Sequence, residues 1–518
     1  MRDQHIQELS AVVKQQTSAM LAEAPVGDLV RLDWLQALVW TVVKAACAAV
    51  VEAWKERLLA MAEGLVRRCP RCGELRKWRW RRGKEMSISL LGLSFRLPNP
   101  YVECGHCDAP GVSVIKLLTD LQSGDSSTAL QLLAAREAAQ HSYGTAAREL
   151  KAHHGQEVER TKVRRMALGV EAEAMGFAED ARRQALTQGP AGSGPAGGWL
   201  TLEADGGKVR TGRLQRCEKG DPGYRQRTAK RGARRRKRPA DWRELITMDV
   251  RAPGEGKPRI LDVLLPNGAP KGERTRRMRA AALRAGMGQK TRIQGLGDMG
   301  SELAPACLAA FPDRKCLWLA DWDHTHAYVK NAAKVLAGLD VTAWQEEMNE
   351  AIWQRDAGAR DLLLTKAFLH RLPTLPPGFE RCPVEALQTY LRNNWAHMQH
   401  RFAKANKLPL VSARAECQVR ERTKRRFTVP GAWLVENLEP KATLRAIIDA
   451  EEWETFRQHV LDRRRESFTA AFAVRLQAAV TVGRLPPDVL RLATGPPFDG
   501  SPGHENDEST PRLQAVAA

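Results

Sequence analysis

Apolar and polar positions follow two different spacings along the chain, and the change falls near residue 190. Before that point apolar residues recur mostly at three- and four-residue steps, as in Leu29–Val51, which places them on one face of a helix. After it come short apolar runs typical of strands, the clearest being Trp199–Ala204, Leu245–Val250 and Lys315–Ala320. The pattern predicts a helical first part and an α/β second part.

Composition refines this division. Gln188–Gly198 is too rich in Gly and Pro for regular structure, so it predicts a linker, and the Pro- and Gly-rich end of the chain predicts disorder. The expected architecture is a multidomain α/β protein. Its expected parts are a helical region 1–66, a Cys-rich segment 67–115, a helical block 120–187, the linker 188–198, an α/β core 199–328, a helical stretch 329–408, a C-terminal part 409–482 and a disordered tail 483–518.

The net charge points to a polyanionic partner. Lys and Arg number 81 against 60 Asp and Glu, which gives +21, so nucleic acid is the first candidate and an anionic membrane surface the second. The longest apolar stretch, Trp34–Val51, is interrupted by Gln36 and Lys44, whereas a membrane span needs about 20 apolar residues. We expect a buried helix there, and a protein of the reducing cytoplasm because no secretory signal precedes the ten cysteines.

Four cysteines form two Cys-x-x-Cys pairs. Cys69 and Cys72 make the first, and Cys104 and Cys107 make the second, with residues 73–103 between them. Two such pairs supply four thiolates for a tetrahedral Zn²⁺, and the intervening segment suits the β-hairpin of a zinc ribbon. The alternative of four unrelated thiols does not explain the paired spacing. The spacing therefore predicts one structural Zn²⁺ in segment 67–115.

Two basic runs are candidate DNA contacts. In the first run, Arg76–Trp80, cations alternate with aromatic rings. Such side chains contact phosphate and sugar whatever the base sequence, although a solvated hairpin with its Trp pair in the ribbon core is an alternative. The second, Arg225–Arg238, would repel itself unless phosphates neutralised it. The candidates are Arg76, Lys77, Trp78, Arg79 and Trp80 in the first run, and Arg234, Arg235, Arg236, Lys237 and Arg238 in the second.

Residues 142–168 have the pattern of a helix-turn-helix. A short helix from Gly144 to Ala152 would turn at His153–Gly155 and lead into a second helix from about Val158 to Leu168. An ordinary helical hairpin explains the pattern equally well. In the first interpretation the second helix presents four cations to DNA, namely Arg160, Lys162, Arg164 and Arg165.

Several carboxylates occupy positions suited to metal chemistry. Asp205, Asp298 and Asp321 each follow a β-like run, and Glu416 lies where a basic helical stretch begins. Phosphoryl transfer on DNA uses two Mg²⁺ ions about 3.5–4 Å apart, and carboxylates on different elements supply the hard oxygen ligands. With 60 acidic residues, such sets also arise by chance as incidental surface carboxylates.

The order of these motifs resembles the bacterial insertion-sequence transposases of the Kra and Lre groups, relatives of the Mutator-type DDE transposases. The resemblance spans roughly residues 65 to 460. This chain departs from the family at Val411–Ala415, where the family has a Gly-rich turn, and at Asp323, where it has an aromatic residue. The motifs are Asp205-Gly, Gly-Asp298, Asp321-x-x-His324, Ser412-x-x-x-Glu416 and Gly431-Ala-Trp433.

The resemblance implies an RNase H-like core with an α-helical insertion at 329–408, preceded by the zinc ribbon and a helix-turn-helix-like DNA-binding domain. Asp205, Asp298 and Glu416 would be the DDE triad that binds two Mg²⁺ (or Mn²⁺) ions, and Asp321 and His324 would support the active centre. The implied activity is strand cleavage at transposon ends, followed by attack of the freed 3′-hydroxyl on target DNA. A homodimer or larger assembly on double-stranded DNA, at the bacterial nucleoid, would carry it out.

Two other classes of function stay open. A transposase-derived, non-catalytic, sequence-specific DNA-binding protein would use only the ribbon and the helix-turn-helix. An RNA-binding protein would use the same cations and Trp side chains. The presence of Asp205, Asp298 and Glu416 favours the enzyme, since a DNA-binding protein without catalysis has no need of all three.

Overall fold

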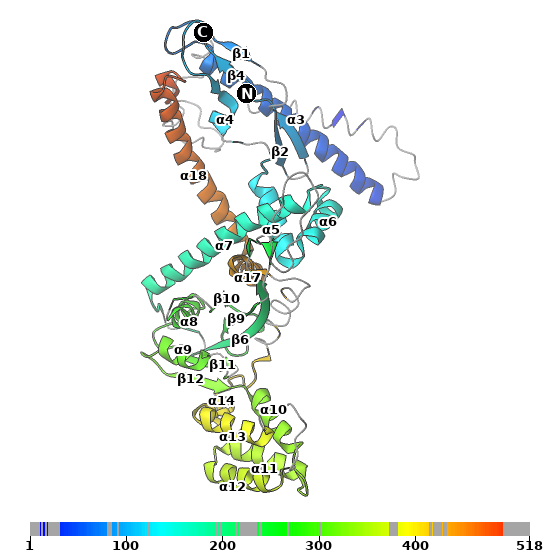
Figure 1. Cartoon of the computed structure of the whole chain (residues 1–518), viewed down its shortest axis with the longest axis vertical. Helices are drawn as coiled ribbons and strands as arrows, with labels where there is room; N and C mark the ends of the chain where they lie inside the picture. The colour runs from blue at the N-terminus through cyan, green and yellow to red at the C-terminus, as the bar shows by residue number, and fades with distance from the viewer. Residues whose placement is uncertain are drawn as a thin grey trace. The chain divides into compact units, whose positions relative to one another are not determined.

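The structure, a computed structural model, divides into two compact units (Figure 1). Unit 1 comprises residues 1–137, 143–166 and 457–518, and unit 2 comprises residues 138–142 and 167–456. The described residues are 11, 14, 15, 18 and 32–490, apart from 80–84, 91–92, 120, 122–123, 193, 196–197, 213–214, 217–235, 238–240, 267–268, 271, 298, 300–301, 372–381, 414–416, 418–426 and 428–432.

Unit 1 combines long helices with small antiparallel sheets. Strands β1, β4 and β5 form one sheet, and β2 pairs with β3 in a separate hairpin. Its elements are α3 (Leu32–Val66), β1 (Lys77–Arg79), β2 (Met86–Leu90), β3 (Leu93–Leu97), β4 (Tyr101–Glu103), β5 (Val112–Ser113), α4 (Val114–Thr119), most of α5 (Thr128–Gln140), α6 (Tyr143–His154), the first turns of α7 (Arg160–Gln188), most of α18 (Trp453–Thr481) and η3 (Pro487–Leu490).

The apolar core of unit 1 joins segments from both ends of the chain. Leu58 and Val66 of α3 pack in one cluster with Ile115 of α4 and Leu476 of α18. The chain segment after residue 457 therefore completes the core around the Cys-rich segment, whereas the sequence pattern assigned residues 409–482 to the α/β core.

Helices α6 and α7 lie where the sequence predicts a helix-turn-helix. Helix α6 ends at His154, Gly155 adopts a left-handed conformation with φ 60°, and α7 begins at Arg160. Helix α7 runs on to Gln188, well beyond the predicted end near Leu168.

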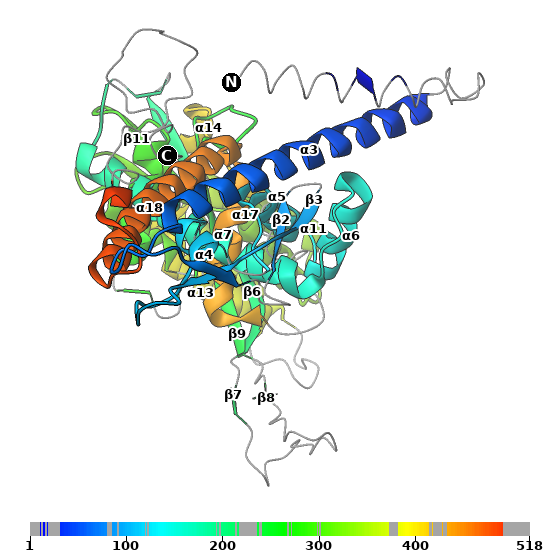
Figure 2. The same cartoon turned by 90° about the horizontal axis from the view of Figure 1, so that it is seen from above.

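Unit 2 is built on a mixed sheet in the order β10-β9-β6-β11-β12. Strand β6 pairs antiparallel with β9 and parallel with β11; β9 and β10 are antiparallel, and β11 and β12 are parallel. A short strand, β13, also pairs with β6, and β7 and β8 form a separate ribbon that projects away from the sheet (Figure 2). The strands are β6 (Trp199–Gly212), β7 (Gln215–Arg216), β8 (Arg236–Lys237), β9 (Asp241–Arg251), β10 (Ile260–Leu264), β11 (Arg292–Gly297), β12 (Cys316–Ala320) and β13 (Trp433–Leu434).

Helices cover both faces of this sheet. Leu202, Val250 and Trp318 face α8 (Glu273–Arg284) and α9 (Leu303–Ala310) and belong with them to one apolar cluster. On the opposite face, Leu296 packs against α14 (His400–Ala405) and Val209 packs against α17 (Val435–Asp449). Because both faces are covered, β6 begins with six consecutive buried residues instead of an alternating pattern.

A helical bundle follows β12 directly, seen beyond the sheet in Figure 1. Its core contains Val329, Trp344, Leu364 and Leu387, one from each of its main helices. The sequence places this insertion at 329–408, and its first helix in the structure begins seven residues earlier, at Trp322. The helices are α10 (Trp322–Ala333), α11 (Val341–Gln354), α12 (Ala357–Leu369), α13 (Pro383–Asn394) and the short η1 (Trp395–His397), with α14 leading back to the sheet.

Candidate functional site

Three neighbouring parallel strands align in register where each has a residue that is followed in the sequence by an aspartate. Strands β11 and β12 end there, but β6 continues to Gly212, so Asp205 lies within β6, paired in register with Thr247 of β9, whereas the sequence predicts that the strand ends there. Gly297, the last residue of β11, is the register partner of Ala204 in β6 and of Ala320 in β12. Asp205 follows Ala204, and Asp321 follows Ala320. The aspartate after Gly297 is Asp298, which lies outside the described residues. The register therefore brings the backbone positions before all three predicted aspartates into one row across the sheet.

Glycine is required in β11 for this close packing. A Cβ at Gly297 would lie 2.2 Å from the carbonyl oxygen of Ala204, and a Cβ at Gly295 would lie 2.2 Å from the Trp318 ring. The first contact is with backbone, which cannot move aside as a flexible side chain can. Gly297 thus sets the approach of β11 to β6 directly before Asp298.

Asp205 shares its side of β6 with a buried charged group. Side chains alternate along a strand, so Asp205 and Glu203 point to the same face. Glu203 pairs in register with Asp249 of β9, and Arg251 forms ion pairs with both, at 3.2 Å to the Asp249 Oδ2. The Asp205 carboxylate is half-buried, and its Oδ1 accepts a hydrogen bond of 2.7 Å from the Gly206 N–H.

Asp321 is buried completely and holds two segments together. It is the N-cap of α10, where Oδ1 accepts a hydrogen bond of 2.9 Å from the His324 N–H. Its Oδ2 accepts hydrogen bonds from the Ser412 N–H and, at 2.5 Å, from the Ser412 hydroxyl. The carboxylate thus acts within the fold, as a cap and as a tie to the segment that leads toward Glu416.

The segment 409–412 is fixed at two further points, one on the sheet and one on the first residue of α10. The Gln294 side chain of β11 donates a hydrogen bond of 2.7 Å to the Pro409 carbonyl, and the Trp322 N–H donates one of 3.0 Å to the Leu410 carbonyl. Glu416 itself lies outside the described residues. The structure thus fixes the chain four residues before the predicted metal ligand.

His324 lies beside this tie on the first turn of α10. Its side chain is 38% exposed, and its Nδ1 lies 3.7 Å from Oδ1 of Asp321, which is too long for a hydrogen bond. Asp321 and His324 are therefore neighbours, as the Asp-x-x-His spacing predicts, with the imidazole on the more accessible side.

The four predicted zinc ligands come together in unit 1. The sulfur atoms of Cys69, Cys72, Cys104 and Cys107 all lie within 4.8 Å of one another, and Gly73 forms the turn of the first pair with φ 77°. Burial opposes ionisation of Cys69, but hydrogen bonds from the backbone N–H groups of Arg71 and Cys72 outweigh it and lower the pKa of that thiol to about 6. Such a set of four sulfurs could hold a structural Zn²⁺.

Two of the predicted DNA contacts point into the protein. Arg76 is buried, and its Nη1 donates a hydrogen bond of 2.7 Å to the Arg484 carbonyl. The Lys162 ammonium donates one of 2.8 Å to the Ser89 hydroxyl, and desolvation, with the nearby Arg165, lowers its pKa. In this structure both cations serve contacts within unit 1.

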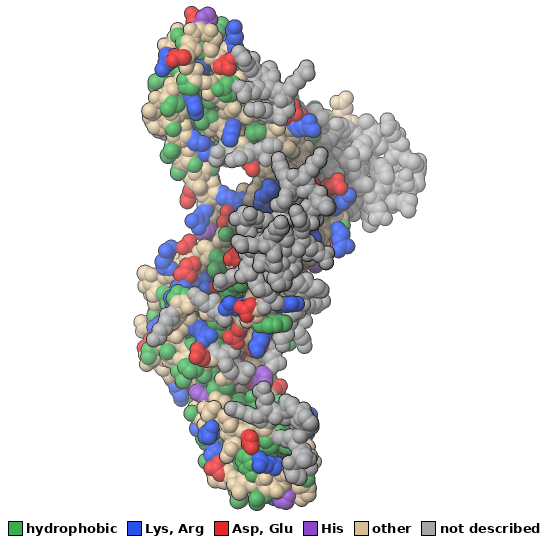
Figure 3. All heavy atoms as spheres, viewed as in Figure 1, with side chains coloured by type: hydrophobic (Ala, Val, Ile, Leu, Met, Phe, Trp, Pro, Cys, Tyr) green, Lys and Arg blue, Asp and Glu red, His purple; other side chains and the backbone are tan. Residues whose placement is uncertain are grey.

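Of the other predicted DNA contacts, four are exposed cations, and the side chains of the rest are not described. Lys77, Arg160, Arg164 and Arg165 are exposed. On the face drawn in Figure 3, coloured basic side chains are interspersed with acidic ones, so no single basic patch dominates there. Trp80, Arg234, Arg235 and Arg238 lie outside the described residues, and only the backbone is described for Trp78, Arg79, Arg236 and Lys237.

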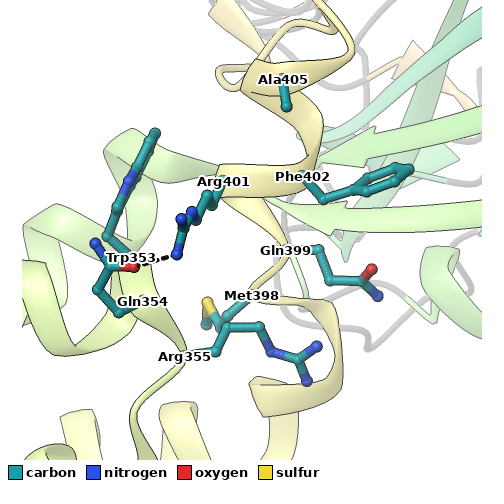
Figure 4. Close-up of a pocket in the computed structure, with 8 residues that line it drawn as sticks. All are labelled: Trp353, Gln354, Arg355, Met398, Gln399, Arg401, Phe402 and Ala405. Atoms are coloured by element: carbon teal, nitrogen blue, oxygen red, sulfur yellow. Dashed lines mark hydrogen bonds between the residues drawn. The ribbon is translucent and has the colours of Figure 1, made fainter.

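The sequence motifs missed a cavity in the helical insertion. It has a volume of about 360 Å³ and lies between the end of α11 and the start of α14 (Figure 4). Arg355 and Arg401 are among its lining residues. Neither belongs to a basic run in the sequence, so no local signal distinguishes them from other surface arginines.

Comparison with known proteins gives little further information. No protein-family model matches the chain, and no curated protein matches it. Among solved structures, the chain is similar to one described as the Drosophila P element transposase strand transfer complex, with 10% sequence identity, coverage of 71% of this chain and 90% of that chain, and a TM-score of 0.23. A TM-score this low carries no weight for fold or function. Separately, every helix among the described residues is too short or too polar to span a membrane.

Proposed function

We propose that this chain is a DDE-type DNA transposase of the Kra and Lre groups, which cleaves DNA strands at transposon ends and joins them to target DNA. The observation that carries the proposal is the row of Ala204, Gly297 and Ala320 across three parallel strands, each residue preceding an aspartate. A chance set of acids among 60 has no reason to follow adjacent register positions.

The architecture of unit 2 supports an RNase H-like core. Three antiparallel strands are followed by two parallel ones in the order β10-β9-β6-β11-β12, which is the arrangement expected of that fold. A helical insertion after β12 and the return of the chain along the sheet at 409–412 are also expected of it. The helical insertion was implied by the resemblance, and none of these features depends on the distant structural match.

In this proposal Asp205, Asp298 and Glu416 hold two divalent metal ions. The half-buried Asp205 carboxylate fits that role, because it is a hard oxygen donor on β6 next to the position where β11 ends. Bound Mg²⁺ would supply charge stabilisation for the attacking and leaving oxygens. Asp321 acts as a positioning residue for the segment before Glu416, and His324 supports the active centre.

The chemistry is two phosphoryl transfers. In the first, water attacks a phosphorus atom at the transposon end, the bond from phosphorus to the 3′ oxygen breaks, and a 3′-hydroxyl is released. In the second, that hydroxyl attacks a phosphorus atom of target DNA, and one phosphodiester bond replaces another. The zinc ribbon and the α6–α7 pair would bind the double-stranded ends in a dimer or larger assembly.

The decisive experiment incubates the purified chain with Mg²⁺ or Mn²⁺ and a duplex carrying the terminal repeats that flank its gene. Wild type is expected to cut and join strands, while Asp205→Asn and Glu416→Gln bind the same duplex without cutting it. Asp361→Asn, a surface carboxylate paired with Arg360, is the matched control and should retain activity. Binding without cleavage by wild type would instead identify a transposase-derived DNA-binding protein.

A further inference from the structure

The cavity between α11 and α14 has a cationic lining. It is lined by Arg355 and Arg401 together with the amide side chains of Gln354 and Gln399, and none of its described lining residues is acidic. Figure 4 shows the Arg401 side chain reaching toward Gln354 and Trp353, and the Arg355 side chain extending to the side on which Gln399 lies. With a volume of about 360 Å³, it is at the small end of the range for ligand sites, and so suits one small anionic group.

The two arginines differ from others of unit 2 in their partners. Arg371 pairs with Glu385 at 2.9 Å and Arg279 with Asp313 at 3.0 Å. Among the described residues, Arg355 and Arg401 have no carboxylate within 4.0 Å; they donate instead to the Trp395 carbonyl at 3.3 Å and to the Gln354 side-chain oxygen at 2.7 Å. Two guanidinium charges thus line one pocket with only neutral partners, an arrangement suited to binding an anion from solution.

The backbone at Arg355 gives a second, independent observation. Arg355 ends α11 in the left-handed conformation, with φ 58°. That position is often occupied by Gly, because in the left-handed conformation a Cβ comes close to the following carbonyl oxygen. Arg355 thus combines a left-handed backbone with a place in the wall of a pocket, and left-handed residues other than Gly occur often at binding sites. The carboxylate of Asp356, the next residue, caps α12 by accepting a hydrogen bond of 2.9 Å from the Ala359 N–H.

We propose that this cavity is a subsite for a phosphodiester group of the DNA strand, bound by Arg355 and Arg401. Lys404 adds a third cation nearby, with its Nζ 5.3 Å from the centre of the Trp353 ring. The inference rests on the proposed function, since it takes DNA as the ligand of unit 2. It adds a contact in the helical insertion, away from the predicted basic runs.

The test measures the affinity of the full-length chain for a labelled duplex oligonucleotide across a range of KCl concentrations. Arg401→Gln and Arg355→Gly each remove one cation. Loss of one phosphate contact should reduce the slope of log K against log salt by about 1, and should weaken binding about eightfold at 0.1 M salt. Arg371→Gln, an exposed arginine of the same bundle that already has an acidic partner, is the control and should bind as wild type does.

Arg355→Gly also separates binding from folding. Glycine relieves the left-handed backbone, so the unfolding temperature should stay the same or rise while affinity falls. If instead the unfolding temperature falls and affinity is unchanged, Arg355 serves the Trp395 contact and the subsite is refuted. If wild type binds the duplex and both pocket variants match Arg371→Gln, the subsite is wrong and the proposed function stands. If wild type does not bind DNA, the proposed function fails and the subsite fails with it.

Discussion

The carboxylate of Asp321 accepts two hydrogen bonds from Ser412, 91 positions later in the chain, one from the backbone N–H and one from the hydroxyl. Because Asp321 directly follows β12 and Ser412 precedes Glu416 by four residues, this pair fixes the returning chain to the end of the sheet. Asp321 also caps α10, so one buried side chain joins the sheet, the insertion and the returning segment.

Removing either partner should destabilise the fold, and the two effects should be coupled. Asp321→Ala loses a helix cap and charge-assisted hydrogen bonds, so we expect the free energy of unfolding to fall by about 2–3 kcal/mol. Ser412→Ala should cost about 1 kcal/mol, and the double variant should be less destabilised than the sum by about 1 kcal/mol. Urea unfolding of all four proteins measures this coupling.

The control pairs Ser412→Ala with Asp356→Ala. Asp356 caps α12 in the same way and has no contact with Ser412 among the described residues, so these two effects should add within about 0.5 kcal/mol. If the losses of stability in Asp321→Ala and Ser412→Ala add as fully as those in Asp356→Ala and Ser412→Ala, the hydrogen bonds between Asp321 and Ser412 do not stabilise the fold.

A methyl group at Gly297 should be poorly tolerated. In Gly297→Ala the new Cβ would meet the Ala204 carbonyl oxygen at 2.2 Å, so β11 would have to move from β6. We expect a loss of about 1–3 kcal/mol in the free energy of unfolding, measured by denaturant titration. Strand cleavage should fall as well, because the shift displaces the strand end before Asp298.

Gly169 provides the matched control for this substitution. It lies within α7, where an added Cβ meets nothing within 4 Å. Gly169→Ala should therefore raise stability by about 0.5–1 kcal/mol, through helix propensity alone. Finding that Gly297→Ala is equally stabilising would show that β11 does not approach the Ala204 carbonyl so closely.

The end of β12 before Asp321 could be predicted from the sequence, whereas the continuation of β6 past Asp205 and the register between the strands could not. Asp205 and Asp321 each end an apolar run, which is a local pattern. The alignment of Ala204 with Gly297 and Ala320 depends on how three separated strands pack, and no residue near any of them specifies it. The Cys-x-x-Cys spacing was informative because four ligands around one ion impose their own geometry.

Charge patterns were less informative about individual side chains. Arg76 and Lys162 lie in basic segments and were predicted to contact DNA, but each is engaged in a long-range contact inside unit 1, with Arg484 and Ser89. A count of charges cannot reveal such contacts, because they depend on segments far away in the chain. Arg355 and Arg401 went unnoticed for the same reason, since only the packing of α11 beside α14 brings them to one pocket.

The cysteine cluster predicts a metal-dependent unit 1. Freshly purified protein should contain about one Zn²⁺ per chain by elemental analysis, and a strong chelator should lower its unfolding temperature. Cys72→Ser should lose the metal, because its sulfur lies 3.5 Å from that of Cys104 within the cluster. Cys47→Ser, an exposed thiol on α3 outside the cluster, should keep it. Retention of zinc by Cys72→Ser would refute the ligand assignment.

His400 should make the stability of unit 2 sensitive to mild acid. Its imidazole is buried, which lowers its pKa, although a hydrogen bond of 2.9 Å to the Ala320 carbonyl and the charge of Asp321 oppose that shift. Because the pKa is lower in the folded state than in the unfolded chain, the unfolded chain binds more protons near the ordinary value of about 6.5. Stability should therefore be fully present above that value and decrease as the pH falls from about 6.5 towards the lowered folded-state pKa.

The measurement is urea unfolding of wild type and His400→Gln from pH 8 to pH 5. Glutamine can still donate a hydrogen bond to the Ala320 carbonyl but carries no titrating group, so the variant should lose less stability than wild type over this range. Equal pH profiles for His400→Gln and wild type would show that His400 does not titrate between the two states. If wild type loses more stability than His400→Gln, the neutral form of this one buried imidazole stabilises the end of β12, where Ala320 precedes Asp321.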